Sequence, residues 1–509
     1  MNTAVPHAGG SDLSVDLPTV HQMAARVRRP RRILFAAMGV GLFAELFFDE
    51  RPLGLSFPLF VVGSVAALLA LGGKEAFSRA RKNTWLLAPL FFFATMVFWR
   101  DSLTPFNVGA SAVLFFLLVH LWAADRVEDL ALLQYPLAVL RSVAYAMLKP
   151  PGLVSSAVDV QGARTVVGPL LKPLLRGAAL TLPVLLLFGA LLSSADPAFS
   201  AALGRLSFDP LMTAWDLGER LLVVAGWSFA AVGLFSHALR RSVGSELVPS
   251  LPATPRLGFL EGTMLLVSTN TLFLAFTLVQ GAYFLDASEL MGIPHLTYSD
   301  YARRGFFQLV AVAMLTLLLL LAVQRWLRLS SPRQAAVFKV AATALIGSTM
   351  LLLASALHSM HLYEETYGYT RLRVDSHVFM LALGACLFWR AVTLWWRPER
   401  FAFGAFLCAL SFGVVLNLIN PDAFIAKKNL AREHVDALYL AELSADAAPA
   451  LAEAVPRLSP RDAELVQYAL DRHASRTSGL LSTKLPVWRA ATLARSEDDH
   501  AALREHHDL

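Results

Sequence analysis

A short polar stretch, YEETYGYTRLRVDSH at residues 363–377, gathers acids, arginines, tyrosines and a histidine between two long apolar runs. Guanidinium groups bind phosphate or carboxylate through two parallel hydrogen bonds. Two roles are therefore open for this stretch. It contributes to a site for an anionic headgroup, or its charges form ion pairs that lock the ends of neighbouring helices together.

A second stretch with possible chemistry is FFDERP at residues 47–52, where Asp49 and Glu50 directly follow an apolar run. This arrangement resembles that of membrane glycosyltransferases that use lipid-phosphate sugar donors. In those enzymes an acidic pair at this location holds a divalent metal or activates the acceptor. The alternative is a solvated turn. The HExxH, Walker A, GxSxG, CxxC and GxGxxG patterns are absent from the sequence, so no metal site and no cofactor is predicted.

Composition identifies the elements that must position these residues. Of 509 residues, 56% are hydrophobic and only 16% are charged, with a mean hydropathy of +0.54, which indicates a polytopic membrane protein. The net charge of +6 then reflects arginines of cytoplasmic loops and does not indicate nucleic-acid binding. Cys386 and Cys408 each lie within an apolar run, which argues against a disulfide framework and redox chemistry.

An all-α bundle of about eleven membrane-spanning helices is predicted, because each crossing of a bilayer core takes roughly 20 apolar residues. The spans are expected at 33–48, 53–71, 85–99, 105–123, 177–193, 221–239, 258–284, 306–324, 338–360, 377–396 and 401–419. The first, third and fifth are short, so they tilt little or one pair is re-entrant.

Basic residues set the expected orientation, because Lys and Arg are retained in cytoplasmic loops. The loops on the same side of the membrane as the N-terminus hold about three times as many basic residues as the loops on the other side. This predicts a cytoplasmic N-terminus and an extracytoplasmic C-terminus. The expected organisation is a disordered cytoplasmic N-terminus (1–32), four spans (33–123), an amphipathic cytoplasmic segment (124–176), seven spans (177–419) and an extracytoplasmic helical tail (420–509). The amphipathic segment either lies on the membrane surface or forms a linker helix under the bundle.

This orientation places three polar segments on one outer face: 285–305, 361–376 and the stretch that begins at Asn420. We expect Arg371 or Arg373 to lie within salt-bridge reach of an acid from another of these segments. The candidate outer cluster comprises Tyr298, Asp300, Tyr301, Arg303, Glu364, Tyr367, Arg371, Arg373, Asn420, Asp422 and Asn429.

Polar residues inside the spans are a further candidate set, because such groups are costly in lipid and face a cavity or a partner. Glu45, Gln280, His358 and Asn417 fall at a similar outer depth. They line a pocket beneath the outer cluster, or each forms a hydrogen bond between helices.

Three segments resemble an uncharacterised bacterial family of polytopic membrane proteins, known as domain of unknown function 4173, and its relative 4153. They are TYSDYARRGFFQL (297–309), YGYTRLRV (367–374) and NPDAFIAKKNLAR (420–432). The matching positions are Tyr298, Tyr301, Arg303, Gly305, Phe306, Tyr367, Gly368, Thr370, Arg371, Asn420, Asp422, Ile425, Ala426 and Asn429. The resemblance implies an integral protein of the bacterial cytoplasmic membrane with no established activity.

Three functions follow as hypotheses. The first is a non-enzymatic membrane protein whose outer face binds a lipid headgroup or an envelope protein. The second is a lipid-phosphate-dependent glycosyltransferase-like enzyme that uses Asp49 and Glu50. The third is a small-solute transporter, although the Gly and Pro interruptions do not form two matching sets.

Overall fold

The computed structural model describes residues 30–48, 52–122, 126–148, 209–239, 257–285, 298–477, 479 and 481–493. Within this part, side chains are not described at 30, 73–80, 209–216, 280–285 and 298–307. The regular elements of the described part are helices, with one isolated bridge between Leu257 and Leu327. The chain divides into two compact units, residues 1–42 with 143–241 and residues 43–142 with 242–509.

The predicted helical membrane architecture is confirmed at the level of fold class, whereas the count of eleven spans is not. Seven described helices are long and apolar enough to cross a membrane. They are Thr104–Leu121, Leu217–Leu239, Phe259–Val279, Gln308–Trp326, Pro332–Tyr367, Arg371–Trp395 and Pro398–Ile419. They coincide with the fourth and the sixth to eleventh predicted spans. The first three predicted spans lie in α2 (Pro30–Phe48), α3 (Ser56–Ala80) and α4 (Leu87–Trp99), and the fifth lies outside the described residues.

The smaller unit is held together by close approach of helix backbones. In α11 (Asp209–Leu239), Val224 and Ser228 meet Gly41 of α2 so closely that a Cβ at Gly41 would lie 2.5 Å from the Val224 carbonyl oxygen. Gly233 of α11 contacts the end of α6 (Gln134–Leu148) in the same way, where the Tyr145 carbonyl oxygen would lie 2.5 Å from an added Cβ. Larger side chains at either glycine would separate these helices.

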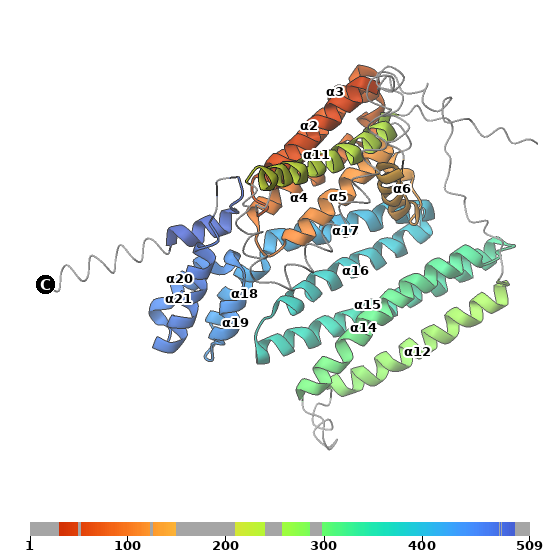
Figure 1. Cartoon of the computed structure of the whole chain (residues 1–509). Helices are drawn as coiled ribbons and strands as arrows, with labels where there is room; N and C mark the ends of the chain where they lie inside the picture. Colours follow the sequence, from red (N-terminus) through yellow and green to blue (C-terminus); the bar gives the residue numbers. More distant parts are fainter. Residues whose placement is uncertain are drawn as a thin grey trace, which may run out of the picture. The chain divides into compact units, whose positions relative to one another are not determined.

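The main layer of the larger unit consists of α12 (Phe259–Leu285), α14 (Tyr298–Trp326), α15 (Pro332–Tyr367) and α16 (Arg371–Trp395), side by side (Figure 1). Buried Leu, Val, Phe and Met side chains from these four helices form one continuous core. Next to α16 follows α17 (Phe401–Ile419), which packs against α4 and α5 (Thr104–Leu121). Gly413 makes this contact possible, because a Cβ there would lie 2.8 Å from the Phe106 ring.

One end of the larger unit is closed by short polar contacts. Asn83 donates a hydrogen bond to the carbonyl oxygen of Leu121 (3.0 Å) and accepts one from the backbone N–H of Val127 (3.0 Å). Arg400, before α17, forms an ion pair with Glu128 at 3.6 Å. These contacts bring the start of the predicted amphipathic segment under α5 and α17. The following helix α6 exposes Leu140 and Met147, and residues 149–176 lie outside the described residues.

An arginine is buried within the membrane helix α16, inside the predicted span 377–396: Arg390. It lies inside α16, only 2% exposed, and donates to the side-chain oxygen of Gln324 on α14. Its guanidinium also lies 5.2 Å from the centre of the Phe401 ring. Near the end of a helix, a long basic side chain is retained inside the bundle when another helix supplies an oxygen acceptor.

At the opposite end, the segment 361–376 is not the loop that was expected. Helix α15 continues to Tyr367, ends at Gly368, and α16 begins at Arg371, so only residues 368–370 connect the two helices. Gly368 has φ of 80°, the left-handed conformation that glycine adopts readily at a helix end. The polar residues of this segment are therefore the last turns of one helix and the first turns of the next.

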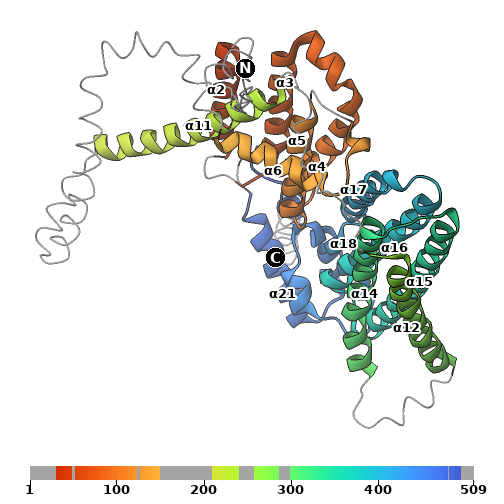
Figure 2. The ribbon, with the colours of Figure 1, turned by 90° about the vertical axis from the view of Figure 1, so that its right-hand side faces the viewer.

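The tail forms a small helical domain at this same end (Figure 2), here called the C-terminal domain and comprising residues 421–493. It contains α18 (Pro421–Leu430), α19 (Ala437–Glu442), α20 (Ala448–Ala454), α21 (Pro460–Ala474) and a helical segment at 485–493. Its core of small and aliphatic side chains includes Val374 from the first turn of α16. The domain thus shares its core with a membrane helix.

Candidate functional site

Arg371 and Asp422 are brought together at the junction between the membrane helices and the C-terminal domain. The Nε and Nη2 groups of Arg371 donate to Oδ1 and Oδ2 of Asp422 at 3.0 and 2.6 Å. The Asp422 side chain is 1% exposed, and it also accepts a hydrogen bond from the backbone N–H of Ser444 (2.8 Å). The salt bridge expected of Arg371 is present, and it joins α16 to α18 by a two-point contact.

The turn between α15 and α16 is held by two further residues of the C-terminal region. The side-chain amide of Asn429 accepts from the backbone N–H of Tyr369 and donates to its carbonyl oxygen, both at 2.8 Å. Arg432 donates to the last carbonyl groups of α15, those of Glu364 (3.2 Å), Glu365 (2.9 Å) and Thr366 (2.8 Å). A cation at a helix C-terminus satisfies its unpaired carbonyls and interacts favourably with the helix dipole.

Glu364 and Arg373 have different partners from those of Arg371. Glu364 is 2% exposed, and its Oε1 lies 3.2 Å from Nδ1 of His377. Arg373 donates to the carbonyl oxygens of Tyr367 and Gly368, and its guanidinium lies 4.3 Å from the centre of the Tyr363 ring. Both residues therefore stabilise the junction of α15 and α16 from within.

Asn417, a predicted intramembrane residue, forms a hydrogen-bonded pair with Asn107 of α5. Each side-chain amide donates to the oxygen of the other, at 2.8 and 3.0 Å, and both side chains are fully buried. The carbonyl oxygen of Asn417 also accepts from Nε of Arg100 (2.9 Å). Of the two roles considered for this residue, the structure shows a hydrogen bond between helices. Asn420, three residues later, has φ of 54° and ends α17.

The other candidates are placed only in part. Glu45 lies half-buried on α2, and His358 lies on an exposed face of α15. The backbone of Tyr298, Asp300, Tyr301 and Arg303 belongs to the first turns of α14, and their side chains are outside the described residues, as is that of Gln280. Asp49 and Glu50 also lie outside them. A pocket formed by Glu45, Gln280, His358 and Asn417, and a role of the acidic pair, stay predictions.

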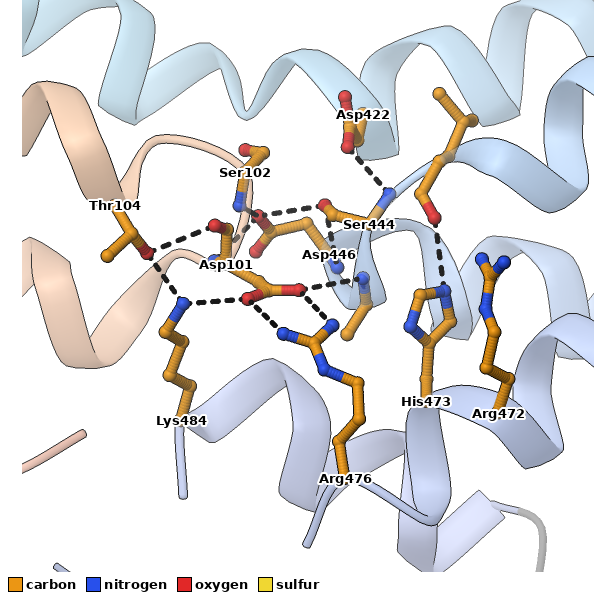
Figure 3. Close-up of polar contacts among 12 residues, drawn as sticks. Asp101, Ser102, Thr104, Asp422, Ser444, Asp446, Arg472, His473, Arg476 and Lys484 are labelled. Atoms are coloured by element: carbon orange, nitrogen blue, oxygen red, sulfur yellow. Dashed lines mark hydrogen bonds and ion pairs between the residues drawn. The ribbon is translucent and has the colours of Figure 1, made fainter. Parts of the chain in front are cut away.

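A second polar cluster, which the sequence analysis did not select, surrounds Asp101 in the turn between α4 and α5 (Figure 3). Asp101 is 5% exposed and forms ion pairs with two basic side chains of the C-terminal domain. Nζ of Lys484 lies 2.8 Å from Oδ1, and Nη1 of Arg476 lies 3.0 Å from Oδ2. Lys484 also donates to the Thr104 hydroxyl at 2.7 Å, so it contacts the first residue of α5 as well.

A reciprocal contact is made by Asp446 of the C-terminal domain. Its Oδ2 accepts from the backbone N–H groups of Asp101 (2.9 Å) and Ser102 (2.8 Å). Among the described residues, its Oδ1 is buried and has no hydrogen-bond partner. The turn and the domain therefore each bind a carboxylate of the other. Side chains of the domain bind Asp101, and backbone N–H groups of the turn bind Asp446.

Burial and charge act differently on these groups. Burial opposes ionisation of Asp101, yet Lys484 and Arg476 outweigh it and lower the pKa of this carboxyl to about 2. Burial raises the pKa of the Asp446 carboxyl, although hydrogen bonding by Ser102 acts against this shift. Burial also lowers the pKa of His473, whose Nε2 lies 3.0 Å from the carbonyl oxygen of Leu443. Asp101 is consequently ionised and His473 neutral at pH 7.

These contacts together form what is called here the outer clamp: the Arg371–Asp422 pair, the contacts of Asn429 and Arg432, and the contacts of Asp101 and Asp446 with their partners. Successive predicted spans alternate in direction, which also assigns the turn at Asp101, after the third span, to the outer face. The sequence therefore contained a signal for the location of Asp101. No such signal identifies the basic partners Arg432, Arg476 and Lys484. The sequence of a polar tail does not show which group each of its basic residues will bind.

A model of the family described as Domain of unknown function (DUF4153) matches residues 87–454. The matched range extends from the start of α4 through α20 and includes the Arg371–Asp422 pair, Asn429 and Asp101. Of the two families named in the sequence analysis, 4153 is therefore the one shown, and membership of 4173 is not. No curated protein and no solved structure matches the chain.

Proposed function

Because the chain belongs to the DUF4153 family, whose domain is of unknown function, we propose a role from its geometry. The protein is an integral protein of the bacterial cytoplasmic membrane that holds a C-terminal binding domain at the extracytoplasmic surface. This domain binds a component of the envelope there, a lipid headgroup or a protein. The proposed orientation follows from the excess of basic residues in the loops on the same side as the N-terminus.

The observation that supports this role most is the pairing of Arg371 with Asp422. The guanidinium of Arg371 makes a two-point contact with a buried carboxylate, so its charge is neutralised inside the protein. Asp101 is neutralised in the same internal way. The charges at this end therefore fix the position of the C-terminal domain, and the surface that they position is the better candidate for binding.

Neither alternative gains an observation in its favour. The glycosyltransferase-like hypothesis depends on Asp49 and Glu50, which lie outside the described residues. Within the described part of the chain, α14, α15 and α16 are continuous helices over their full lengths, whereas transporter sites commonly use interrupted ones. We therefore keep a binding role as the conclusion.

The experiment compares molecules that purify with the full-length protein. Wild type, R371A and R457A are extracted in mild detergent and analysed by mass spectrometry for bound lipids and proteins. R457A is the matched control, because Arg457 is 78% exposed and, within the described part of the chain, forms an ion pair with Glu453 at 3.8 Å. We expect a specific lipid or protein on wild type and R457A that R371A loses. The same set of molecules on all three proteins would contradict the proposal.

A further inference from the structure

A small pocket lies at the boundary between the C-terminal domain and the segment that leads into α3. Its volume is about 230 Å³, and it is lined by Pro52, Arg476, Ser482, Thr483, Lys484 and Val487. The backbone N–H of Ser56, the first residue of α3, donates to the carbonyl oxygen of Leu481 at 2.9 Å, which holds the two walls together. Pockets for drug-sized ligands begin at roughly 300 Å³, so this one suits a smaller group.

The two cations of the lining keep unused hydrogen-bond donors. Within the described part of the chain, Lys484 uses two of its three N–H groups, on Asp101 and Thr104. Arg476 likewise uses two of its five N–H groups, both on Asp101. The side chain of Lys484 is only 11% exposed, so its charge is weakly screened by solvent. The remaining donors can bind an anion with several acceptor oxygens.

The charge of the pocket lining is positive. The lining contributes two cations, Arg476 and Lys484. The carboxylates in this network are Asp101, which two cations neutralise, and Asp446, whose pKa burial raises. Among the described residues, the two cations of the lining share one carboxylate, that of Asp101, so a negatively charged ligand is favoured over a neutral one.

The position of the pocket along the chain indicates where the anion comes from. Lys484 of the lining contacts Thr104, the first residue of a helix long and apolar enough to cross a membrane, so the pocket lies near the point where that helix would leave the hydrocarbon core. Trp488 follows the lining residue Val487 and is 55% exposed. Tryptophan is enriched at the level of lipid headgroups, where its ring contacts apolar chains and its N–H contacts water.

We propose that this pocket binds the phosphate group of a phospholipid headgroup, with Arg476 and Lys484 as the charged donors. This inference rests on the proposed function and names the ligand class of the C-terminal domain. Arg476 and Lys484 then link two tasks, because the same side chains neutralise Asp101 of the outer clamp. A bound phosphate would strengthen the attachment of the domain to the membrane helices.

The test titrates the full-length protein in detergent with dioleoyl phosphatidylglycerol and counts bound lipids by native mass spectrometry. Dioleoylglycerol, which lacks the phosphate, and inorganic phosphate, which lacks the chains, are titrated in parallel. We expect phosphatidylglycerol to bind to wild type and dioleoylglycerol not to bind. Equal binding of dioleoylglycerol would overturn the phosphate site, and inorganic phosphate that binds as tightly as the lipid would overturn the lipid assignment.

Three variants locate the binding. R476Q removes one charge of the pocket, R476K keeps it, and R472Q removes a charge one helical turn away on α21, outside the lining. Loss of a charge-assisted hydrogen bond should weaken lipid binding by about tenfold or more in R476Q. R476K should restore most of it, and R472Q should bind as wild type does. Equal loss in R476Q and R472Q would overturn the assignment to this pocket.

Hydrogen exchange of α21 in each variant separates a lost ligand from a lost fold. Unchanged exchange in R476Q, together with weakened lipid binding, supports the pocket, because Lys484 still neutralises Asp101. If R476Q keeps full lipid binding while R371A loses a co-purified ligand, the pocket is refuted and the proposed function stands. If wild type binds added lipid through Arg476 but purifies with the same molecules as R371A, the pocket stands and the proposed dependence of binding on the Arg371–Asp422 pair fails.

Discussion

At the scale of single residues, the molecule is organised by two buried carboxylates that meet their cations across long sequence distances. Asp422 is held by Arg371, and Asp101 by Lys484 and Arg476. A buried carboxylate is costly unless it is paired and hydrogen-bonded. Each pair therefore makes separation of the C-terminal domain from the membrane helices unfavourable, since separation leaves charged groups with fewer partners.

The first prediction concerns the charge of Asp422. The isosteric variant D422N keeps the shape of the side chain but weakens its contacts with Arg371 and with the Ser444 backbone. We expect a loss of about 1 to 3 kcal/mol in the free energy of unfolding. The matched change E453Q alters an exposed pair at 3.8 Å and should be close to neutral. Thermal unfolding of both variants in the same detergent measures this, and equal unfolding temperatures would contradict it.

A second prediction concerns pH and His473. Burial lowers the pKa of this histidine in the folded protein below its ordinary value of about 6.5. The unfolded chain then binds more protons as pH falls below 6.5, so the contribution of His473 to stability is lost as pH falls from 6.5 to the folded pKa. H473Q cannot titrate and should lose less stability than wild type over this range. Parallel pH profiles of the unfolding temperature for the two proteins would refute the role of His473.

At the scale of elements, the positions of most helices could be predicted, but their ends could not. The apolar runs at 338–360 and 377–396 indicated two spans, yet α15 and α16 extend to Tyr367 and back to Arg371. A hydropathy pattern ends where polar residues begin, whereas a helix continues through Glu and Tyr until a residue such as Gly368 adopts another conformation. The glycine was the available signal for the true boundary.

The pair between Asn107 of α5 and Asn417 of α17 gives a prediction at this scale. Each single change to leucine, N107L or N417L, should leave the other amide buried without its partner and cost about 1 to 2 kcal/mol. The double variant should lose less than the sum of the two, because no unpaired amide remains. Thermal unfolding of the four proteins measures this coupling, and strict additivity would show that the pair contributes nothing.

At the scale of the whole molecule, the sequence predicted the all-α membrane class and the end at which the polar residues collect. Parity of the spans placed residues 361–376 and the tail on one face, and the structure joins them through Arg371 and Asp422. The ion pairs of Asp101 could not be predicted from the alternation of the spans, because Arg476 and Lys484 lie more than 370 residues away along the chain. Which base meets which acid is decided by the packing of the C-terminal domain.

The proposed orientation predicts which residues react from outside the cell. Leu438 on α19 and Leu329 between α14 and α15 are both exposed, at 63% and 41%, and belong to opposite faces in the proposed topology. In a background with C386S and C408S, L438C should react with a membrane-impermeant maleimide on spheroplasts, and L329C should react only after lysis. The reverse pattern would place the C-terminal domain in the cytoplasm.

The central claim is that the outer clamp holds the C-terminal domain on the membrane helices, and hydrogen exchange of the full-length protein tests it most directly. Val374 at the start of α16 belongs to the core of the domain, so separation exposes that core. We predict that R371A speeds amide exchange in α19 and α21 while leaving α15 and α17 unchanged, and that R457A exchanges as wild type does. Identical exchange of α19 and α21 in R371A and wild type would contradict the claim.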